Sequence, residues 1–248
     1  MDKRISVLGC SLAILIAGPA GLGVSSASAT LTQVGSSAAL GSNLVIDWSA
    51  FGPAGTNLSC FCSTPVGPLT VGINGSSGLL NRVNEGTNYV GNFTIGNALL
   101  AQPFVSDQMF VSFATPVSAV GTQLQPLSSS QTPSVVLTGL IGPFTGTMQV
   151  FTDDGMDASF TVAGTGSHAE DGSASFIGVT STTSDITGVT FYANVGNPMF
   201  PEVGSIAINA VDVRVGAVPE PPSALLLVPA IGAMLLAGAA GRRRAWSS

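Results

Sequence analysis

Two uncharged apolar segments lie near opposite ends of this 248-residue chain and leave the residues between them to form a folded domain. They cover residues 5–17 and 223–241. A segment of about 18 residues or more can cross a bilayer as a helix, whereas about 7–15 residues are typical of a secretory leader. We therefore expect three parts: a leader over 1–29, a domain over 30–217 and a membrane-directed tail over 218–248.

The N-terminal segment has the organisation of a signal peptide. Lys3 and Arg4 form a positive start, the apolar run follows, and Ala27-Ser28-Ala29 is a small-residue cleavage site. Ala27 and Ala29 are the residues that a signal peptidase would read. We expect cleavage after Ala29, so that the mature chain is exported and begins at Thr30.

The C-terminal segment is flanked on both sides by residues that define its role. Val218-Pro219-Glu220-Pro221-Pro222 precede it, and Arg242–Arg244 follow it. The prolines keep the backbone extended and prevent a helix from starting there. Residues 223–241 are predicted to form one transmembrane helix. The arginines would stay on the cytoplasmic side, which places everything before Val218 outside.

This order of proline motif, apolar span and arginine cluster resembles the PEP-CTERM sorting tail of Gram-negative bacteria. The resemblance implies that a membrane-embedded exosortase recognises the motif and cuts near it with its own cysteine, so that this chain is a substrate. A plain C-terminal anchor behind a proline-rich linker is the alternative. The residues concerned are Val218, Pro219, Glu220 and Pro221 for the sorting motif and Arg242, Arg243 and Arg244 for the stop-transfer element.

The region 30–217 carries little charge, and most of that charge is negative. Eleven carboxylates stand against two basic residues, Arg82 and Arg214, which gives a formal net charge of −9, and no lysine is present. Nucleic acids and anionic lipid surfaces are bound by basic patches. We therefore expect no nucleic-acid partner. A length of about 190 residues suits one domain with a sizeable core.

The same region has the pattern of many short β-strands. Runs rich in Val, Ile, Phe and Thr alternate with Gly, Pro, Asn and Asp, and only 97–102 offers a helical alternative. The clearest hairpin spans 147–163, where Asp154-Gly155 suits a tight turn. The pattern predicts an all-β, antiparallel sandwich or barrel. Further strands are expected at 109–113, 117–124, 134–137, 175–180, 188–193 and 206–215.

Two strand signatures resemble those of PEP-CTERM ectodomains. Residues 113–121 read Phe-x-x-Pro-Val-x-Ala-x-Gly, and 176–179 with 186–191 resemble the next signature. A final strand just before the tail is also usual in that group. The resemblance implies a jelly-roll-like β-sandwich, similar in outline to carbohydrate-binding modules.

Two cysteines, Cys60 and Cys62, belong to the exported region. Export favours oxidation, but residues two apart on an extended strand lie near the upper limit of disulfide spacing. An intrachain disulfide would need a turn, and Pro65, Gly67 and Pro68 suggest a loop nearby. A link between two chains also stays open. A metal site is less favoured, because two further ligands are missing.

Acidic residues gather at the tip of the predicted hairpin and in the loop after it. Asp153, Asp154 and Asp157 surround the tip, and Glu170 and Asp171 follow. Aspartate is favoured in turns for its local hydrogen bonds, so solvated turn residues are the first interpretation. A calcium ion held by carboxylates and loop carbonyls is the alternative, although the spacing differs from an EF-hand. No other cofactor is expected.

The chain has few candidate catalytic residues. His168 is the single histidine, it sits in turn composition, and no nucleophile elbow accompanies it. Besides the phenylalanines, Trp48, Tyr89 and Tyr192 are the candidates for stacking on a sugar, and Trp48 is expected in the core. We assign no catalytic residue.

These observations favour a non-catalytic surface or extracellular-matrix protein. Before processing it would be anchored in the inner membrane by one helix, and afterwards it would lie at the cell surface or outside the cell. The family resemblance implies a role in exopolysaccharide or biofilm. A lectin-like polysaccharide-binding module is the alternative, favoured by exposed aromatic side chains and a bound cation. A polysaccharide hydrolase, which needs two carboxylates facing each other across a cleft, is the third.

Overall fold

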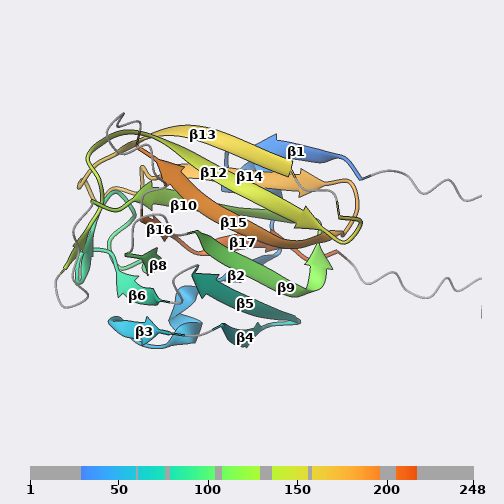
Figure 1. The fold of residues 1–248 in the computed structure, drawn as a ribbon, viewed down its shortest axis with the longest axis horizontal. Helices are drawn as coiled ribbons and strands as arrows, with labels where there is room; N and C mark the ends of the chain where they lie inside the picture. The colour runs from blue at the N-terminus through green and yellow to red at the C-terminus, as the bar shows by residue number, and fades with distance from the viewer. Residues whose placement is uncertain are drawn as a thin grey trace, which may run out of the picture.

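The computed structural model describes residues 29–59, 61–75, 79–103, 108–128, 136–155, 158–195 and 205–216. Within these ranges the chain is mostly folded into β-strands, arranged in two large antiparallel sheets, and has almost no helix (Figure 1). The predicted all-β, antiparallel class is therefore confirmed.

The larger sheet contains nine of the described strands. Its main path is β1-β14-β10-β16-β8-β6-β3, and β17 pairs with both β10 and β2. Its strands are β1 (Leu31–Val34), β2 (Leu44–Ile46), β3 (Thr56–Leu58), β6 (Leu80–Asn84), β8 (Ala98–Gln102), β10 (Ala119–Pro126), β14 (Ser175–Ser181), β16 (Ile206–Ile208) and β17 (Val211–Arg214).

The smaller sheet has six described strands in the order β13-β12-β15-β9-β5-β4. They are β4 (Cys62–Val66), β5 (Leu69–Gly75), β9 (Met109–Val117), β12 (Gly142–Thr152), β13 (Ala158–Gly166) and β15 (Ile186–Asn194). Three minor features complete the described fold: a parallel pair of β7 (Tyr89–Val90) with β11 (Leu137–Thr138), the short helix α1 (Ser37–Leu40) and the 3-10 turn η1 (Trp48–Phe51).

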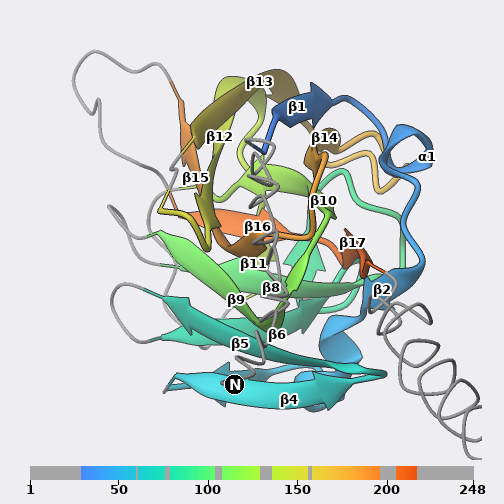
Figure 2. The same cartoon turned by 90° about the vertical axis from the view of Figure 1, so that its right-hand side faces the viewer.

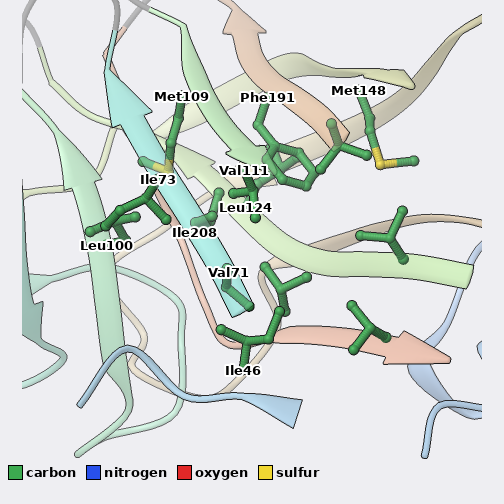
Figure 3. Packing of buried hydrophobic residues seen from close by; sticks show 14 of the residues in the cluster. Ile46, Val71, Ile73, Leu100, Met109, Val111, Leu124, Met148, Phe191 and Ile208 are labelled. Carbon is green, nitrogen blue, oxygen red and sulfur yellow. The ribbon is translucent and has the colours of Figure 1, made fainter. Parts of the chain in front are cut away.

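The two sheets share one hydrophobic core. Ile73 and Met109 come from the smaller sheet, and Leu100 and Ile208 come from the larger one (Figure 3). The indole of Trp48 in η1 is fully buried in the same core, which confirms the expectation that it packs inside. Burial of such apolar surface is the dominant stabilising term in folding.

A second apolar cluster lies on the opposite face of the larger sheet. Leu99 of β8 packs there with Val83 of β6 and with Tyr89 and Phe93 from the loop that follows β6. Strand β8 is therefore apolar on both faces, since Leu100 points into the main core. The loop over 85–97 thus packs against this face of the larger sheet. Figure 2 shows β12, β15, β9 and β5 of the smaller sheet beside β14, β10 and β17 of the larger one.

The predicted hairpin is present as β12 and β13. Thr147 lies opposite Thr161 and Val150 opposite Ala158, and Gly155 in the turn has a φ of 76°. This is the left-handed conformation that glycine adopts without steric cost. The strand expected at 175–180 is β14, and the one expected at 188–193 lies within β15.

Several expected boundaries differ from the structure. Residues 98–102 form a strand, so the helical alternative over 97–102 is wrong. Strand β9 continues to Val117, and its pairing with β15 shifts where Pro116 lacks an N–H. The strand expected at 206–215 is divided in two at Asn209–Ala210. Of the strand expected at 134–137, residues 134 and 135 lie outside the described residues.

Pro65 lies in strand β4 rather than in a loop. Strand β4 is at the edge of the smaller sheet, where a residue without an N–H is tolerated. The turn that was expected nearby is the Gly67-Pro68 connection between β4 and β5.

In the part of the chain that the structure describes, no helix is both long enough and apolar enough to span a membrane. The predicted transmembrane segment 223–241 lies outside those residues.

Candidate functional site

The larger sheet changes its strand neighbours at Asn209–Ala210, between β16 and β17. Ile208 lies opposite Leu124 and Asp212 opposite Gly121, so four steps along β16–β17 match three along β10. On the other side, β16 pairs with β8, whereas β17 pairs with β2. The extra residue is a β-bulge, a feature that is common beside binding sites.

Side chains of Trp48 and Thr122 hydrogen-bond to the backbone of this bulge, and the side chain of Asn209 hydrogen-bonds to β10. The indole Nε1 of Trp48 donates to the carbonyl oxygen of Asn209 at 2.7 Å. Thr122 Oγ1 lies 2.9 and 3.0 Å from the carbonyl oxygens of Asn209 and Ala210. Asn209 Nδ2 donates to Gln123 Oε1 at 3.0 Å. The bulge is therefore a rigid feature of the sheet.

Two separate hollows have Asn209 and Ala210 of the bulge among their lining residues. The larger has a volume of about 410 Å³ and the smaller about 240 Å³. The larger hollow combines hydroxyl, amide and carboxylate groups with a somewhat greater apolar surface, and the smaller hollow is mainly polar. The larger is further lined by Gly35, Ser36, Ser37, Gln123, Phe176 and Asp212, and the smaller by Asp47, Ser49, Arg82, Asn84, Gly96, Asn97 and Ala98.

Arg82 is the most unusual residue of the smaller hollow. Its side chain is only 5% exposed, and Nη1 donates to the carbonyl oxygen of Val83 at 3.1 Å and to Asn84 Oδ1. Nε is buried and has no hydrogen-bond partner among the described residues. Burial lowers the pKa of Arg82, and the negative charge of Asp47 opposes this effect. Guanidinium groups nevertheless stay protonated in proteins, so a buried cation lies in the wall of this hollow, with its Nε enclosed by the protein.

A wider hollow of about 680 Å³ lies along β12, β13 and β14, but it offers less chemistry. None of its lining residues is ionisable, and Val195 in its wall adjoins residues outside the described ranges. Its walls are Pro143, Phe144, Thr145, Ala163, Gly164, Thr165, Ser175, Asn194 and Val195.

Glu85 is a second buried ionisable group, and it anchors a loop. Its carboxylate is fully buried and accepts hydrogen bonds from the backbone N–H groups of Gly91 at 2.7 Å and Phe93 at 3.3 Å. Burial raises the pKa of Glu85; the backbone donors oppose this, and the charge of Glu170 adds to it. Although these two carboxylates influence each other, a fully buried Glu85 does not face a cleft in the way a glycosidase requires.

The residues of the predicted sorting signal are not in the described part of the structure. This holds for the motif Val218, Pro219, Glu220 and Pro221, for Arg242 to Arg244, and for Ala27 of the cleavage site. Ala29 is described and is buried. The roles of the sorting motif, the stop-transfer arginines and the cleavage site therefore stay predictions from the sequence.

The predicted acidic cluster is partly described. Asp153 and Asp154 are exposed at the hairpin tip, and Asp157 lies outside the described residues. The backbone N–H of Asp153 donates to the carbonyl oxygen of Asp185, whose own side chain is 5% exposed. Among described side chains, no three His, Cys, Asp or Glu residues group in a way that could hold a metal ion. The calcium alternative stays a hypothesis.

The remaining candidates are widely separated. His168 is exposed in a loop, with Nε2 2.8 Å from the carbonyl oxygen of Gly139. Tyr89 is fully buried, which removes it as a stacking platform, and Tyr192 is half-buried. Cys62 is half-buried on β4, and Cys60 lies outside the described residues, so the state of this pair stays open.

Sequence reasoning missed the hollows at the bulge. Arg82 carried one available signal, because it is a basic residue within a strand-like run of an acidic region. Nothing in the residues around Asn209 marked a bulge. No family model matches this chain, and no curated protein matches its sequence.

Proposed function

We propose that this chain is an exported surface or extracellular-matrix protein that an exosortase processes at its C-terminal tail. One observation carries the proposal: the proline motif, the apolar span and the arginine cluster occur together and in the order that a sorting signal requires. The precursor would be held in the inner membrane by a helix over 223–241. The exported part would be a jelly-roll-like β-sandwich with a non-catalytic role in exopolysaccharide or biofilm.

The hydrogen bonds at both ends of the described fold support this processing. Near the start, Thr30 N donates to Thr182 Oγ1 at 3.0 Å, so cleavage after Ala29 would leave this bond in place. Near the end, Val215 N donates to Asn43 Oδ1 at 2.9 Å. A cut at 219–222 falls after this contact. Both cleavages would therefore leave the described hydrogen bonds of the domain intact.

A lectin-like, polysaccharide-binding module is the second candidate function. The two hollows lined in part by Asn209 and Ala210 favour it, because both contain hydroxyl, amide and carboxylate groups. At these hollows the aromatic side chains give it little support. Trp48 and Tyr89 are fully buried, and Phe61, although 61% exposed, lines neither hollow. The half-buried Phe176 is the one aromatic residue that lines them, so sugar binding there would depend mainly on hydrogen bonds and charge.

Intact-mass spectrometry of the protein from its native host tests the sorting proposal. The wild-type strain should yield a chain truncated near residues 219–222, and a strain lacking exosortase should keep the full tail. Glu220→Gln should reduce processing, because it removes the one charge of the motif. Asp153→Asn, at an exposed hairpin tip, is the matched control and should be processed normally. An uncut tail in both strains would show that the proline motif is only a linker before an ordinary membrane anchor.

A further inference from the structure

We propose that the outer face of the smaller sheet, which points away from the main core, binds an uncharged, extended polysaccharide such as a glucan. This surface is separate from the hollows at Asn209–Ala210. The inference rests on the proposed function only for placing the protein outside the cell, where such polymers occur. The binding surface itself is argued from the six strands of the smaller sheet.

Strand pairing traces this outer face residue by residue. Val111 of β9 is buried in the main core, so its neighbours Phe110 and Ser112 point to the opposite side of the sheet. Residues directly opposite on adjacent strands share a face. One row across five strands therefore consists of Asn74, Phe110, Thr190, Gln149 and Ser159, and the next row consists of Ser63, Gly72, Ser112, Gly188 and Phe151.

The smaller sheet carries no charged side chain. Its six described strands contain none of the Asp, Glu, Lys, Arg and His residues of the chain, although the region 30–217 has two basic residues against eleven acidic ones. An anionic polymer would find no cation on this face, and the net negative charge of the domain would oppose its approach. A second copy of the chain would be opposed in the same way. The charge distribution therefore favours an uncharged partner.

Two aromatic rings lie against the outer face in the space that glycines leave. A Cβ on Gly72 would lie 3.0 Å from Cζ of Phe61. A Cβ on Gly188 would lie 3.1 Å from Cζ of Phe110. Phe61 is 61% exposed, and the half-buried Phe110 packs edge-on against Phe151 with 5.8 Å between ring centroids. These rings offer apolar surface on which the C–H groups of a sugar can pack.

The spacing of the two glycines suits an extended chain of sugars. Gly72 and Gly188 both lie opposite Ser112, one on each side of β9. Neighbouring strands are roughly 4.8 Å apart, so the two glycines are separated by roughly 10 Å across the strands. A polymer that crosses the strands could therefore cover Phe61 and Phe110 together.

Polar side chains beside the rings supply hydrogen bonds. Asn74 and Gln149 carry amides, and Ser112 and Ser159 carry hydroxyls, all of which can donate to or accept from a sugar hydroxyl. Ser159 is exposed and the other three are half-buried, so a ligand on the surface can reach them. A neutral carbohydrate is the class of polymer that combines apolar C–H surface with hydroxyls on every unit.

Calorimetric titration of the full-length chain in lipid nanodiscs tests the charge argument. Cellohexaose and maltohexaose are uncharged glucose chains, and hexagalacturonate has the same length with a carboxylate on each unit. We expect at least one of the glucose chains to bind at least about tenfold more tightly than hexagalacturonate, because the face provides no cation for the carboxylates.

Substitutions of the rings test the location. Phe61→Ala and Phe110→Ala should each weaken binding of the preferred glucose chain by at least about fivefold, because each removes apolar surface that the sugar would cover. Phe61 is mostly exposed, so Phe61→Ala should fold even if Phe110→Ala does not, as circular dichroism would show.

The matched control is Phe176→Ala on the larger sheet. Phe176 is also half-buried and also fills space above a glycine, because a Cβ on Gly121 would lie 2.6 Å from its Cζ. It differs in lining the hollow of about 410 Å³. Its replacement should leave binding unchanged. A loss of binding in Phe176→Ala alone would place the sugar in that hollow and contradict the inference.

Three further results would overturn the inference. Hexagalacturonate binding as tight as that of the glucose chains would remove the preference for an uncharged ligand. A folded wild-type chain that binds neither glucose chain would exclude the site. Dimers in sedimentation that Gln149→Glu dissociates, without sugar binding, would assign the face to a second copy. Tail processing is measured separately in the host, so its failure would leave this titration unaffected, and the reverse also holds.

Discussion

At the scale of single residues, Gln125 joins three loops around one buried amide. Its Oε1 atom accepts hydrogen bonds from Tyr89 OH at 3.2 Å and from Asn92 N at 3.0 Å. Its Nε2 atom donates to the carbonyl oxygens of Leu140 at 3.1 Å and Ser167 at 3.0 Å. All the hydrogen-bonding capacity that this side chain normally uses is therefore satisfied inside the protein.

Gln125→Leu should be strongly destabilising. The substitution keeps the approximate size but leaves the N–H of Asn92, the hydroxyl of Tyr89 and two carbonyl oxygens without this partner. We expect the free energy of unfolding to fall by roughly 2–5 kcal/mol, since each unsatisfied group costs about 1–3 kcal/mol and the costs are not fully additive. Urea denaturation measures it. Gln33→Leu, which removes one exposed bond to the carbonyl oxygen of Thr161, is the control and should change stability by less than about 0.5 kcal/mol.

Gly166 is required where strand β13 passes another segment closely. A Cβ atom at this position would lie 1.9 Å from the carbonyl oxygen of Leu140. Because backbone has to move to relieve this clash, Gly166→Ala should destabilise by about 1–3 kcal/mol, which thermal unfolding would detect. At Gly35 a Cβ would meet nothing within 4 Å, so Gly35→Ala should not lower the melting temperature. Equal effects of the two substitutions would contradict this account.

At the scale of elements, the loop over 85–97 depends on the protonation of Glu85. Its folded pKa is raised above the ordinary value of 4.5, so folding favours the protonated form. The resulting stabilisation is present below pH 4.5 and is lost as the pH rises through the folded pKa. Wild-type stability should therefore fall relative to Glu85→Gln as the pH rises from about 4 to 7.

Urea denaturation of both chains over this pH range measures the difference. Glu170→Gln provides a second check, because the charge of Glu170 contributes to the raised pKa of Glu85. Its removal should shift the pH-dependent step to lower pH. Parallel pH profiles for wild type and Glu85→Gln would show that the carboxylate is not linked to folding.

The elements also show what the sequence reveals about the fold. Period-2 alternation and a turn signal at Asp154-Gly155 were sufficient for the β12–β13 hairpin, because one face of β13 is exposed. Strand β8 has no such alternation, since Leu99 and Leu100 are buried in different clusters. A short, continuously apolar run is compatible with helix or strand, and only the packing of the neighbouring strands decides between them.

The site could be predicted less well than the fold. The hollow around Arg82 exists because β16–β17 contains an extra residue and changes neighbours from β8 to β2. Both features depend on contacts between segments more than 80 positions apart, such as Leu124 with Ile208 and Trp48 Nε1 with the carbonyl oxygen of Asn209. No local spacing rule encodes such a contact, so the sequence indicated an arginine without indicating its surroundings.

At the scale of the whole molecule, the proposed leader cleavage would change which primary amines the protein carries. The only lysine of the chain is Lys3, which lies in the predicted leader. The region 30–217 contains two arginines and no lysine. Cleavage after Ala29 would therefore leave the new α-amino group of Thr30 as the single primary amine of the mature protein.

Amine-reactive labelling tests leader removal without any antibody or tag. Protein isolated from the native host should take up one label per chain, and peptide mass spectrometry should place that label on Thr30. The uncleaved chain, produced where export is blocked, is the control and should carry its labels on its own N-terminus and on Lys3, with none on Thr30. A host-isolated chain labelled at Lys3 would show that the leader is retained, and a label at another residue of the 27–40 region would move the cleavage site to that position. Because α-amino groups have a pKa of roughly 7.7–8.0 and lysines roughly 10.4, labelling near neutral pH should strongly favour the new terminus.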